Sequence, residues 1–332
     1  NTKGLGCGRV ERLDLTKSLA SMTESFPAPL IANTRQITAM ESSLASLTAD
    51  QIKSTVETLE DLGTRFHKSS NGEQIDVTIT NLIASVTSNL EITIASLTHS
   101  GSNQKSVVAK LPGADSSAGI IVMGAHSDSI NSSSDQNEGA APGADDDASG
   151  VATLIEILRV INDGQLKFRR DVEFHFYAAE EVGLVGSSDI AGDYVNAQKP
   201  VIAMLQLDMN SYSSDASKET IYFPINDTDP LLRRGLKDLL NSYLGGDYIE
   251  KYLSGGTSDH RSWSSRNVPA VFPFEDPESY NPYIHSANDT TANANNWPLA
   301  LRFAKLGLLF TAHYGGLLSA SSPQDLAEST AV

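Results

Sequence analysis

The hydrophobic residues of this chain follow two spacings that alternate along the sequence, one typical of helices and one typical of strands. From Ala49 onward, apolar residues recur every three or four positions until Gly63, as on one face of a helix. The same spacing predicts further helices at residues 74–89, 150–161 and 298–318. Short apolar runs predict strands at residues 91–97, 106–111, 120–124, 171–179, 201–207 and 270–274.

Strands that alternate with helices predict an α/β fold, a single domain with a mixed, mostly parallel β-sheet sandwiched by α-helices. The run 201–207 is almost entirely apolar, as expected of a strand that is buried on both faces. Residues 127–144 are rich in Ser, Gly, Asn and acidic residues, and they predict an extended surface loop.

The two ends of the chain are set apart from its middle. Residues 1–45 are rich in Ser, Thr and Ala and are interrupted by Pro27 and Pro29, so we expect an N-terminal extension with one or two short helices. We expect residues 46–320 to form the main folded domain and residues 321–332 to form a C-terminal tail.

The charge of the chain narrows the range of its partners. Its 332 residues include 24 basic and 41 acidic ones, and the resulting net charge of −17 argues against binding to nucleic acid or to anionic membranes. No apolar run reaches the roughly 18–20 residues that span a bilayer. We therefore expect neither nucleic acid nor a membrane as a partner. We also expect a monomer.

A single cysteine, Cys7, rules out an intrachain disulfide, so any metal must be bound by His, Asp or Glu. The chain opens at Asn1 without an initiator Met, a basic region or an apolar signal segment, as a processed precursor would. A trimmed chain would look the same. We expect a secreted protein, extracellular or periplasmic, whose signal peptide is not part of this chain.

Three aspartates in a row, Asp145-Asp146-Asp147, are the most unusual local feature of the sequence. Adjacent like charges repel and aspartate is a poor helix former, so the run has little structural use. A bound multivalent cation reverses this argument, because it turns repulsion into ligation. An acidic surface loop is the commoner explanation of such a triplet. The presence of further potential metal ligands in the chain argues against a plain surface loop; they are His126, Glu180, Glu181, Asp208 and His285.

Most of these side chains come directly after a predicted strand. This holds for His126, for the Glu180-Glu181 pair and for Asp208. The carboxyl ends of strands are where ligands bind in open α/β sheets, so we expect these groups to converge. Two histidines and three carboxylates, without a thiolate, favour Zn²⁺, with Mn²⁺ or Co²⁺ as alternatives.

The number of ligands points to two metal ions. Five protein ligands exceed the three of a catalytic site with one zinc ion, and they match two ions that share a bridging carboxylate. Hydrolysis also needs a general base that does not bind metal. Glu180 and Glu181 offer one, because successive side chains at a strand end point in different directions.

Five segments resemble the co-catalytic zinc aminopeptidases of the bacterial secreted leucyl aminopeptidase type. They are residues 141–150 (APGADDDASG), 178–184 (AAEEVGL), 205–209 (LQLDM), 258–260 (SDH) and 281–285 (NPYIH). The resemblance runs from about residue 48 to about residue 316 and implies an α/β fold of the zinc-peptidase type.

The resemblance implies a role for each ligand. Asp146 would bridge two Zn²⁺ ions. His126 and Asp208 would complete the coordination of one ion, and Glu181 and His285 that of the other.

Supporting roles follow from the same resemblance. Glu180 would be the general base, and Asp128 would orient the imidazole two residues before it. The peptide bond between Asp146 and Asp147 is cis in this family. The chain departs from the family at residues 253–257, which lack a cysteine pair and the tyrosine between its members.

Other residues are open to two interpretations. His260 matches a family motif without being a ligand. Its side chain either orients a metal ligand or only packs against its neighbours. Several apolar side chains are either walls of a substrate pocket or plain core; they are Met209, Phe272, Phe274, Tyr280 and Ile284. His175, inside a predicted strand, is expected to be structural.

The leading interpretation is an exopeptidase that removes N-terminal residues, preferably large apolar ones such as leucine, with two Zn²⁺ ions and Glu180 as the base. Its substrates would be peptide or protein N-termini. A glutaminyl-peptide cyclase would use the same fold with one zinc, and a metal-free binding domain would lack ligands; the complete set of five argues against both. A carboxypeptidase or aminoacylase would carry an inserted lid domain, and no extra segment of that size separates Glu181 from His285.

Overall fold

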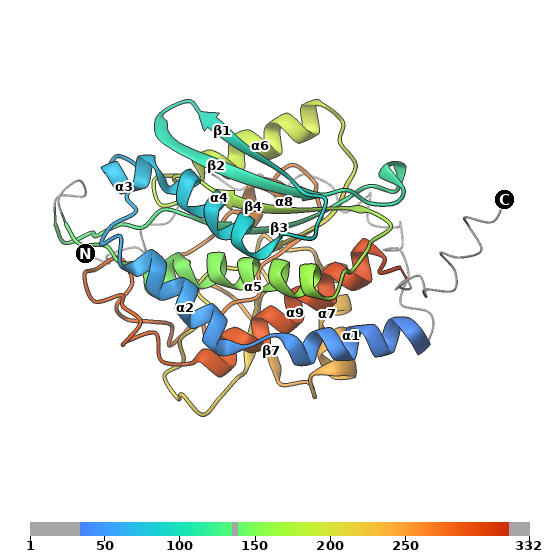
Figure 1. Ribbon diagram of the computed structural model, residues 1–332. Helices are drawn as coiled ribbons and strands as arrows, with labels where there is room; N and C mark the ends of the chain where they lie inside the picture. The colour runs from blue at the N-terminus through green and yellow to red at the C-terminus, as the bar shows by residue number, and fades with distance from the viewer. Residues whose placement is uncertain (1–33, 135–138, 319–332) are drawn as a thin grey trace, which may run out of the picture.

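The computed structural model describes residues 34–134 and 139–318 of the chain. Its centre is a six-stranded sheet in the order β1-β2-β4-β3-β5-β8 (Figure 1). The strands are β1 (Thr93–His99), β2 (Ser102–Leu111), β3 (Ile120–His126), β4 (Asp171–Tyr177), β5 (Val201–Gln206) and β8 (Ala270–Val271). β4, β3, β5 and β8 are parallel, whereas β1 and β2 join one edge in antiparallel fashion. The predicted mixed, mostly parallel sheet is confirmed.

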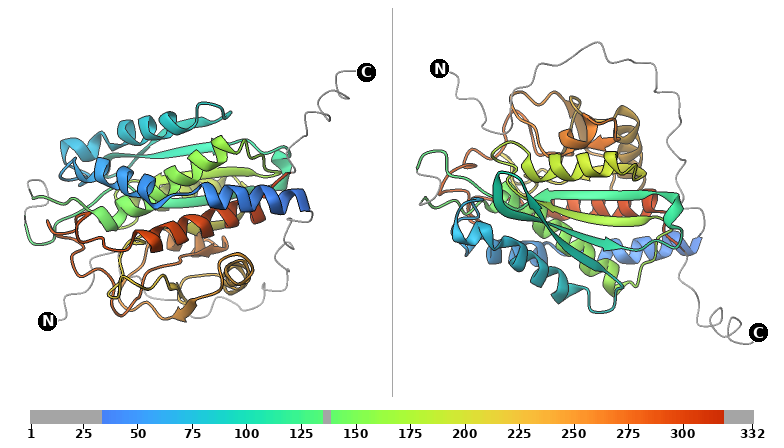
Figure 2. Two further views of the ribbon diagram at one scale, coloured as in Figure 1. Left: turned by 60° about the horizontal axis from the view of Figure 1, so that its bottom comes forward. Right: turned by 90° about the horizontal axis from the view of Figure 1, so that it is seen from above.

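Helices cover both faces of the sheet (Figure 2). One face carries α2 (Ala49–Glu60), α4 (Ile75–Val86), α5 (Ser149–Asp163) and α9 (Trp297–Gly315), and the other carries α6 (Val185–Asn196) and α8 (His260–Ser264). Successive residues of β3 alternate between the two sides, as the pleat of a strand requires. Met123 joins the core beside α5 and α9, and Val122 joins the core beside α6.

The remaining elements lie around this sandwich. α7 (Pro230–Tyr243) packs against α9 and β8, and β6 (Ile221–Pro224) pairs in parallel with β7 (Tyr248–Lys251). A short helix, α3 (Ser70–Glu73), precedes α4. Within the described ranges, none of the helices has both the length and the apolar character needed to cross a bilayer.

Helix α1 (Thr34–Ser46) lies, except for its last residue, inside the segment that the sequence assigned to an N-terminal extension. Its side chains Met40 and Leu44 are buried in the same core as α5 and α9, so α1 is part of the packed domain. The rest of the predicted extension, residues 1–33, and the predicted tail, residues 321–332, lie outside the described residues.

Two further expectations need correction. The segment 127–144 is not simply a surface loop, because residues 127–131 and 141–144 at its two ends are buried. The guanidinium group of Arg65 donates hydrogen bonds to the carbonyl oxygens of Ser127, Pro142 and Gly143 and so holds both ends inside.

The predicted strand 270–274 is also shorter in the structure. Only Ala270 and Val271 pair with β5, at the edge of the sheet. Phe272 and Phe274, which follow, are buried in a separate small cluster of apolar side chains.

Candidate metal centre

Three neighbouring strands deliver candidate residues to one edge of the sheet. β3 ends at His126, β4 is followed closely by Glu180 and Glu181, and β5 is followed by Asp208. Because β4, β3 and β5 are adjacent and parallel, their carboxyl ends lie side by side. All four side chains are buried. The predicted convergence of these side chains is therefore present.

Asp146 lies at the centre of the cluster and contacts both histidines. Its Oδ1 atom is 2.9 Å from Nε2 of His126, and its Oδ2 atom is 3.0 Å from Nε2 of His285. Asp146 stands in the turn Ala144–Ala148 that precedes α5, and its peptide bond to Asp147 is cis. Each oxygen of this carboxylate thus faces a different imidazole.

A second carboxylate stands beside each histidine. Oδ1 of Asp208 is 3.6 Å from Nε2 of His126, and Oε2 of Glu181 is 3.0 Å from Nε2 of His285. Ligand atoms of His126, Asp146 and Glu181 all lie within 4.8 Å of one another. The structure therefore brings all five predicted ligands together, with each histidine between two carboxylates.

The cluster concentrates negative charge in a buried place. Burial alone would raise the pKa of Asp146, but hydrogen bonds from His126 and His285 hold that pKa well below its ordinary value. Burial and the charge of Asp146 raise the pKa of Glu181 to about 7. Three buried carboxylates and two imidazoles, with their oxygen and Nε2 atoms turned toward each other, fit a zinc-binding site.

The other two aspartates of the run bind protein groups instead. Asp147 accepts hydrogen bonds from the backbone N–H groups of His126, at 3.0 Å, and Gly150, at 2.9 Å. Asp145 accepts hydrogen bonds from the hydroxyl of Ser211, at 2.6 Å, and the amide of Asn281, at 3.1 Å. Of the three adjacent carboxylates, the middle one contacts both histidines, and an oxygen of Asp147 lies within 4.8 Å of ligand atoms of His126 and Asp208.

Glu180 differs from its neighbour Glu181. Its carboxylate is buried, and neither oxygen has a hydrogen-bond partner among the described residues. Burial raises the pKa of this carboxyl well above its ordinary value; His126 opposes the rise, and Asp259 and Glu181 add to it. A carboxylate with this high proton affinity, beside the candidate ligands, has the properties of a group that accepts a proton.

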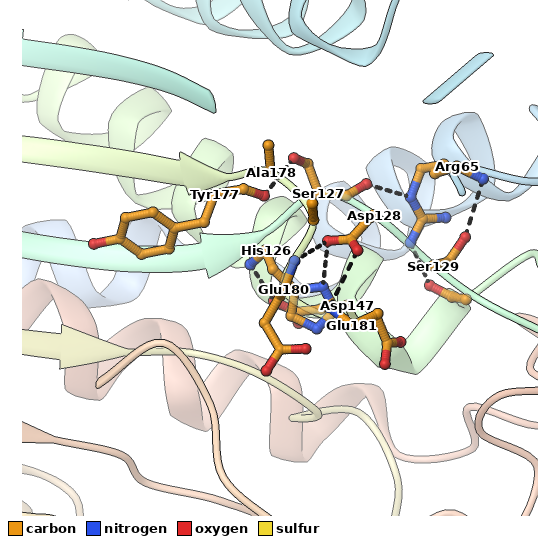
Figure 3. Close-up of polar contacts among 12 residues, drawn as sticks. Arg65, His126, Ser127, Asp128, Ser129, Asp147, Tyr177, Ala178, Glu180 and Glu181 are labelled. Atoms are coloured by element: carbon orange, nitrogen blue, oxygen red, sulfur yellow. Dashed lines mark hydrogen bonds and ion pairs between the residues drawn. The ribbon is translucent and has the colours of Figure 1, made fainter. Parts of the chain in front are cut away.

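Asp128 contacts both the imidazole of His126 and the segment that carries Glu180 and Glu181 (Figure 3). Its Oδ1 atom lies 3.4 Å from Nδ1 of His126, so it can fix the orientation of this imidazole, as the sequence predicted. The same carboxylate also accepts the backbone N–H groups of Glu180, at 2.9 Å, and Glu181, at 3.2 Å. This second contact was not predicted.

Sequence reasoning missed other residues that support the candidate ligands. The hydroxyl of Ser258 donates to Oδ2 of Asp208 at 2.5 Å, and the carboxylate of Asp289 accepts the backbone N–H groups of Asp145 and Asp146, each at 3.1 Å. Ser258 stands in the SDH segment noted from the sequence, which was a usable signal. Asp289 lies in no such segment.

His260 contacts the wall of a pocket. Its ring stacks on Phe272 with a centroid distance of 4.8 Å and an interplanar angle of 26°. Burial, together with the charge of Arg261, lowers the pKa of His260 to about 3, so the ring is neutral. Of the two interpretations of His260, these contacts favour the one in which it packs. Its ring supports Phe272 in the wall of the pocket.

An apolar pocket adjoins the metal-binding residues. Asp146 and Asp208 are among the residues that line it. All five side chains that the sequence proposed for a pocket line it, namely Met209, Phe272, Phe274, Tyr280 and Ile284. Leu253, Gly256 and Thr257 complete the wall, so the segment that departs from the family pattern is part of this pocket.

Comparisons with known proteins agree with this geometry. The profile of peptidase family M28 matches residues 106–311. A probable leucine aminopeptidase of Arthroderma benhamiae is 32% identical over 280 residues, which cover 83% of this chain and 75% of that protein. A probable aminopeptidase of Saccharomyces cerevisiae is 38% identical over 235 residues, which cover 68% of this chain and 63% of that protein.

Solved structures show the same similarity. The LapA aminopeptidase of Legionella pneumophila superposes with a TM-score of 0.79 at 27% identity, over 90% of this chain and 79% of that chain. The family match at residues 106–311 includes all five candidate ligands and Glu180. The chain therefore belongs to peptidase family M28, and it is a zinc-dependent peptide hydrolase of the aminopeptidase type.

Proposed function

We propose that this protein removes N-terminal residues from peptides and proteins, with a preference for large apolar residues such as leucine, and that it uses two Zn²⁺ ions. The observation that carries the proposal is the position of Asp146. Its two oxygens face the two histidines at 2.9 and 3.0 Å, and it also lines the apolar pocket. Metal ligands and pocket thus meet at Asp146, and Asp208 lines the pocket beside it.

The donor set supports two ions rather than one. His126 and Asp208 would hold the first ion, Glu181 and His285 would hold the second, and Asp146 would be shared. When bound, the two ions supply Lewis-acid polarisation of the scissile carbonyl and of the attacking water. A single zinc site needs only three protein ligands, so five converging donors favour the pair.

Glu180 is the proposed general base. It takes a proton from the attacking water as the oxygen bonds to the scissile carbonyl carbon, and it returns that proton to the leaving amine when the carbon–nitrogen bond breaks. Its buried carboxylate has no hydrogen-bond donor among the described residues, which supports this role. Glu181, one residue on, contacts His285 and is therefore the better ligand.

The pocket is the proposed binding site for the side chain of the N-terminal residue. Its walls are mostly aromatic and aliphatic, which favours large apolar side chains over charged ones. Asp146 and Asp208 in its lining carry negative charge, which would attract the free α-amine of the substrate.

A panel of aminoacyl-arylamides, assayed with and without a chelator, tests the proposal. We expect the leucine substrate to be among the best, and we expect the chelator to abolish its hydrolysis. Zinc content measured on the purified protein should be about two ions per chain. One ion per chain would favour a cyclase, and full activity without metal would contradict the proposal.

A further inference from the structure

The segment that carries Glu180 leaves the sheet directly after β4. At that point its backbone N–H groups are bound by side chains of β2 and no longer by the backbone of β2. β2 pairs with β4 as far as Val107 and Phe176. Beyond this pair, Oγ of Ser106 accepts the backbone N–H of Ala178 at 2.9 Å, and Oε1 of Gln104 accepts that of Ala179 at 2.8 Å. Ser106 and Gln104 are two residues apart in β2, so they point to the same side.

Four consecutive N–H groups after β4 are bound by side chains. Ser106 and Gln104 take the first two, and Asp128 takes those of Glu180 and Glu181. Ala179 has a φ of +54°, a left-handed conformation that a residue with a Cβ adopts only rarely. A local backbone of this kind persists when surrounding contacts determine it, and these hydrogen bonds are such contacts.

The direction of the Glu180 side chain depends on this backbone. Its carboxylate has no hydrogen-bond partner among the described residues, whereas Glu181 is tied to His285 at 3.0 Å. We propose that Gln104 and Ser106 are positioning residues for the reaction, because they fix the main chain at residues 178 and 179 and thereby aim the general base. This inference rests on the role of Glu180 proposed above.

Gln104 is itself held rigidly. It is fully buried, and its Nε2 atom donates to the carbonyl oxygens of Arg65 and Gly72, each at 3.1 Å. These two bonds fix the plane of the amide and turn Oε1 toward Ala179. Arg65 in turn donates to the carbonyl oxygen of Ser127 at 3.1 Å, directly after β3 (Figure 3). Gln104 is therefore connected both to the segment after β4 and to the segment after β3.

Ser106 is oriented by a histidine. Nε2 of His99 lies 2.7 Å from Oγ of Ser106, and Oδ2 of Asp189 lies 3.2 Å from Nδ1 of His99. The order Asp–His–Ser is that of a hydrolase triad, but Ser106 is fully buried and its oxygen already accepts the N–H of Ala178, so it is not a nucleophile. If Nδ1 donates to Asp189, Nε2 accepts the Ser106 hydroxyl proton, and a lone pair stays available for Ala178.

Two variants test the positioning role, Gln104→Met and Ser106→Ala. Misplacing a catalytic group by about 1 Å costs roughly 100-fold in rate, so we expect kcat for a leucine arylamide to fall about 10–100-fold in each variant. KM and zinc content should stay within about twofold of the parent values, and added Zn²⁺ should not restore the rate. The matched control is Ser43→Ala, which removes another buried serine hydroxyl, bound to the carbonyl oxygen of Ala39 in α1, and should leave kcat unchanged.

Combination with Glu180→Gln separates positioning from a general loss of structure. Because both residues act through Glu180, adding Ser106→Ala or Gln104→Met to Glu180→Gln should cause no further loss of kcat. Losses that multiply, or a parental kcat in the single variants at full zinc content, would overturn the inference. If Gln104→Met does not fold, Ser106→Ala decides alone, since it removes one oxygen atom. Full activity of Glu180→Gln itself would instead reject the proposed base.

Discussion

Replacing Glu180 by glutamine tests the proposed mechanism most directly. Glutamine has nearly the shape of glutamate, and the Glu180 carboxylate has no hydrogen-bond partner among the described residues, so no described contact is lost from the fold. What disappears is the ability to accept a proton. General-base contributions of about 10²–10⁴-fold in kcat correspond to about 2.7–5.4 kcal/mol in the activation barrier. Zinc content should stay at the parental level.

The neighbouring substitution Glu181→Gln should behave differently. It alters a carboxylate that lies 3.0 Å from Nε2 of His285, so we expect weaker binding of one ion and a rate that added Zn²⁺ partly restores. Both variants are assayed with a leucine arylamide at low and high Zn²⁺, and the zinc content is measured by atomic emission. Glu57→Gln, at an exposed position of α2, serves as the control. Our assignment is reversed if Glu180→Gln loses zinc while Glu181→Gln retains both ions.

Other predictions concern the metal, the substrate and the support of one ligand. A chelator should abolish activity, and Zn²⁺ or Co²⁺ should restore it; unchanged activity after metal removal would contradict this. Activity should also fall in mild acid, because protonated His126 and His285 release metal. An N-acetylated peptide should be refused while its unblocked twin is cleaved, which a parallel assay by mass spectrometry checks. Ser258→Ala removes the hydroxyl that donates to Asp208 at 2.5 Å, so zinc affinity, measured by titration, should fall about 10–100-fold.

The candidate ligands could be predicted because each stands in a local context that the chain itself displays. His126 ends an apolar run, Asp208 follows another, and Asp146 lies in a run of three adjacent carboxylates. The carboxyl ends of parallel strands meet at one edge, so recognising the strands was enough to bring His126 and Asp208 together. Local pattern and one rule of topology indicated the candidates, whereas the choice of Asp146 among the three aspartates and of Glu181 as the ligand came from the resemblance to a family.

Some elements were missed although a pattern was present. α7 has Asp229 as its N-cap, Pro230 at its first position, and Leu232, Leu236 and Leu239 at helical spacing, which together predict a helix. α6 is different, because its sequence VGSSDIAGDYVN contains two glycines and little amphipathic pattern. Its helix depends on packing against the sheet and α8.

The end of β4 shows why some boundaries could not be predicted. Ala178 and Ala179 continue the apolar run of β4, so the pattern extended the strand to residue 179. In the structure the strand stops at Tyr177, because Ser106 and Gln104 bind the next two N–H groups with their side chains. Those acceptors stand some 70 residues earlier in the chain, at separations of 72 and 75 positions, where no local pattern connects them to Ala178.

The same reasoning explains the acidic residues around the ligands. Four buried carboxylates each accept two backbone N–H groups of segments near the site. Asp128 accepts those of residues 180 and 181, and Asp147 accepts those of residues 126 and 150. Asp289 accepts those of residues 145 and 146, and Glu275 accepts those of residues 212 and 281. A backbone N–H attracts a carboxylate whatever side chain its residue carries. The partners of these carboxylates therefore leave no trace in the sequence, and an acidic residue that fixes a ligand-bearing segment cannot be told from one that faces solvent until the fold places it.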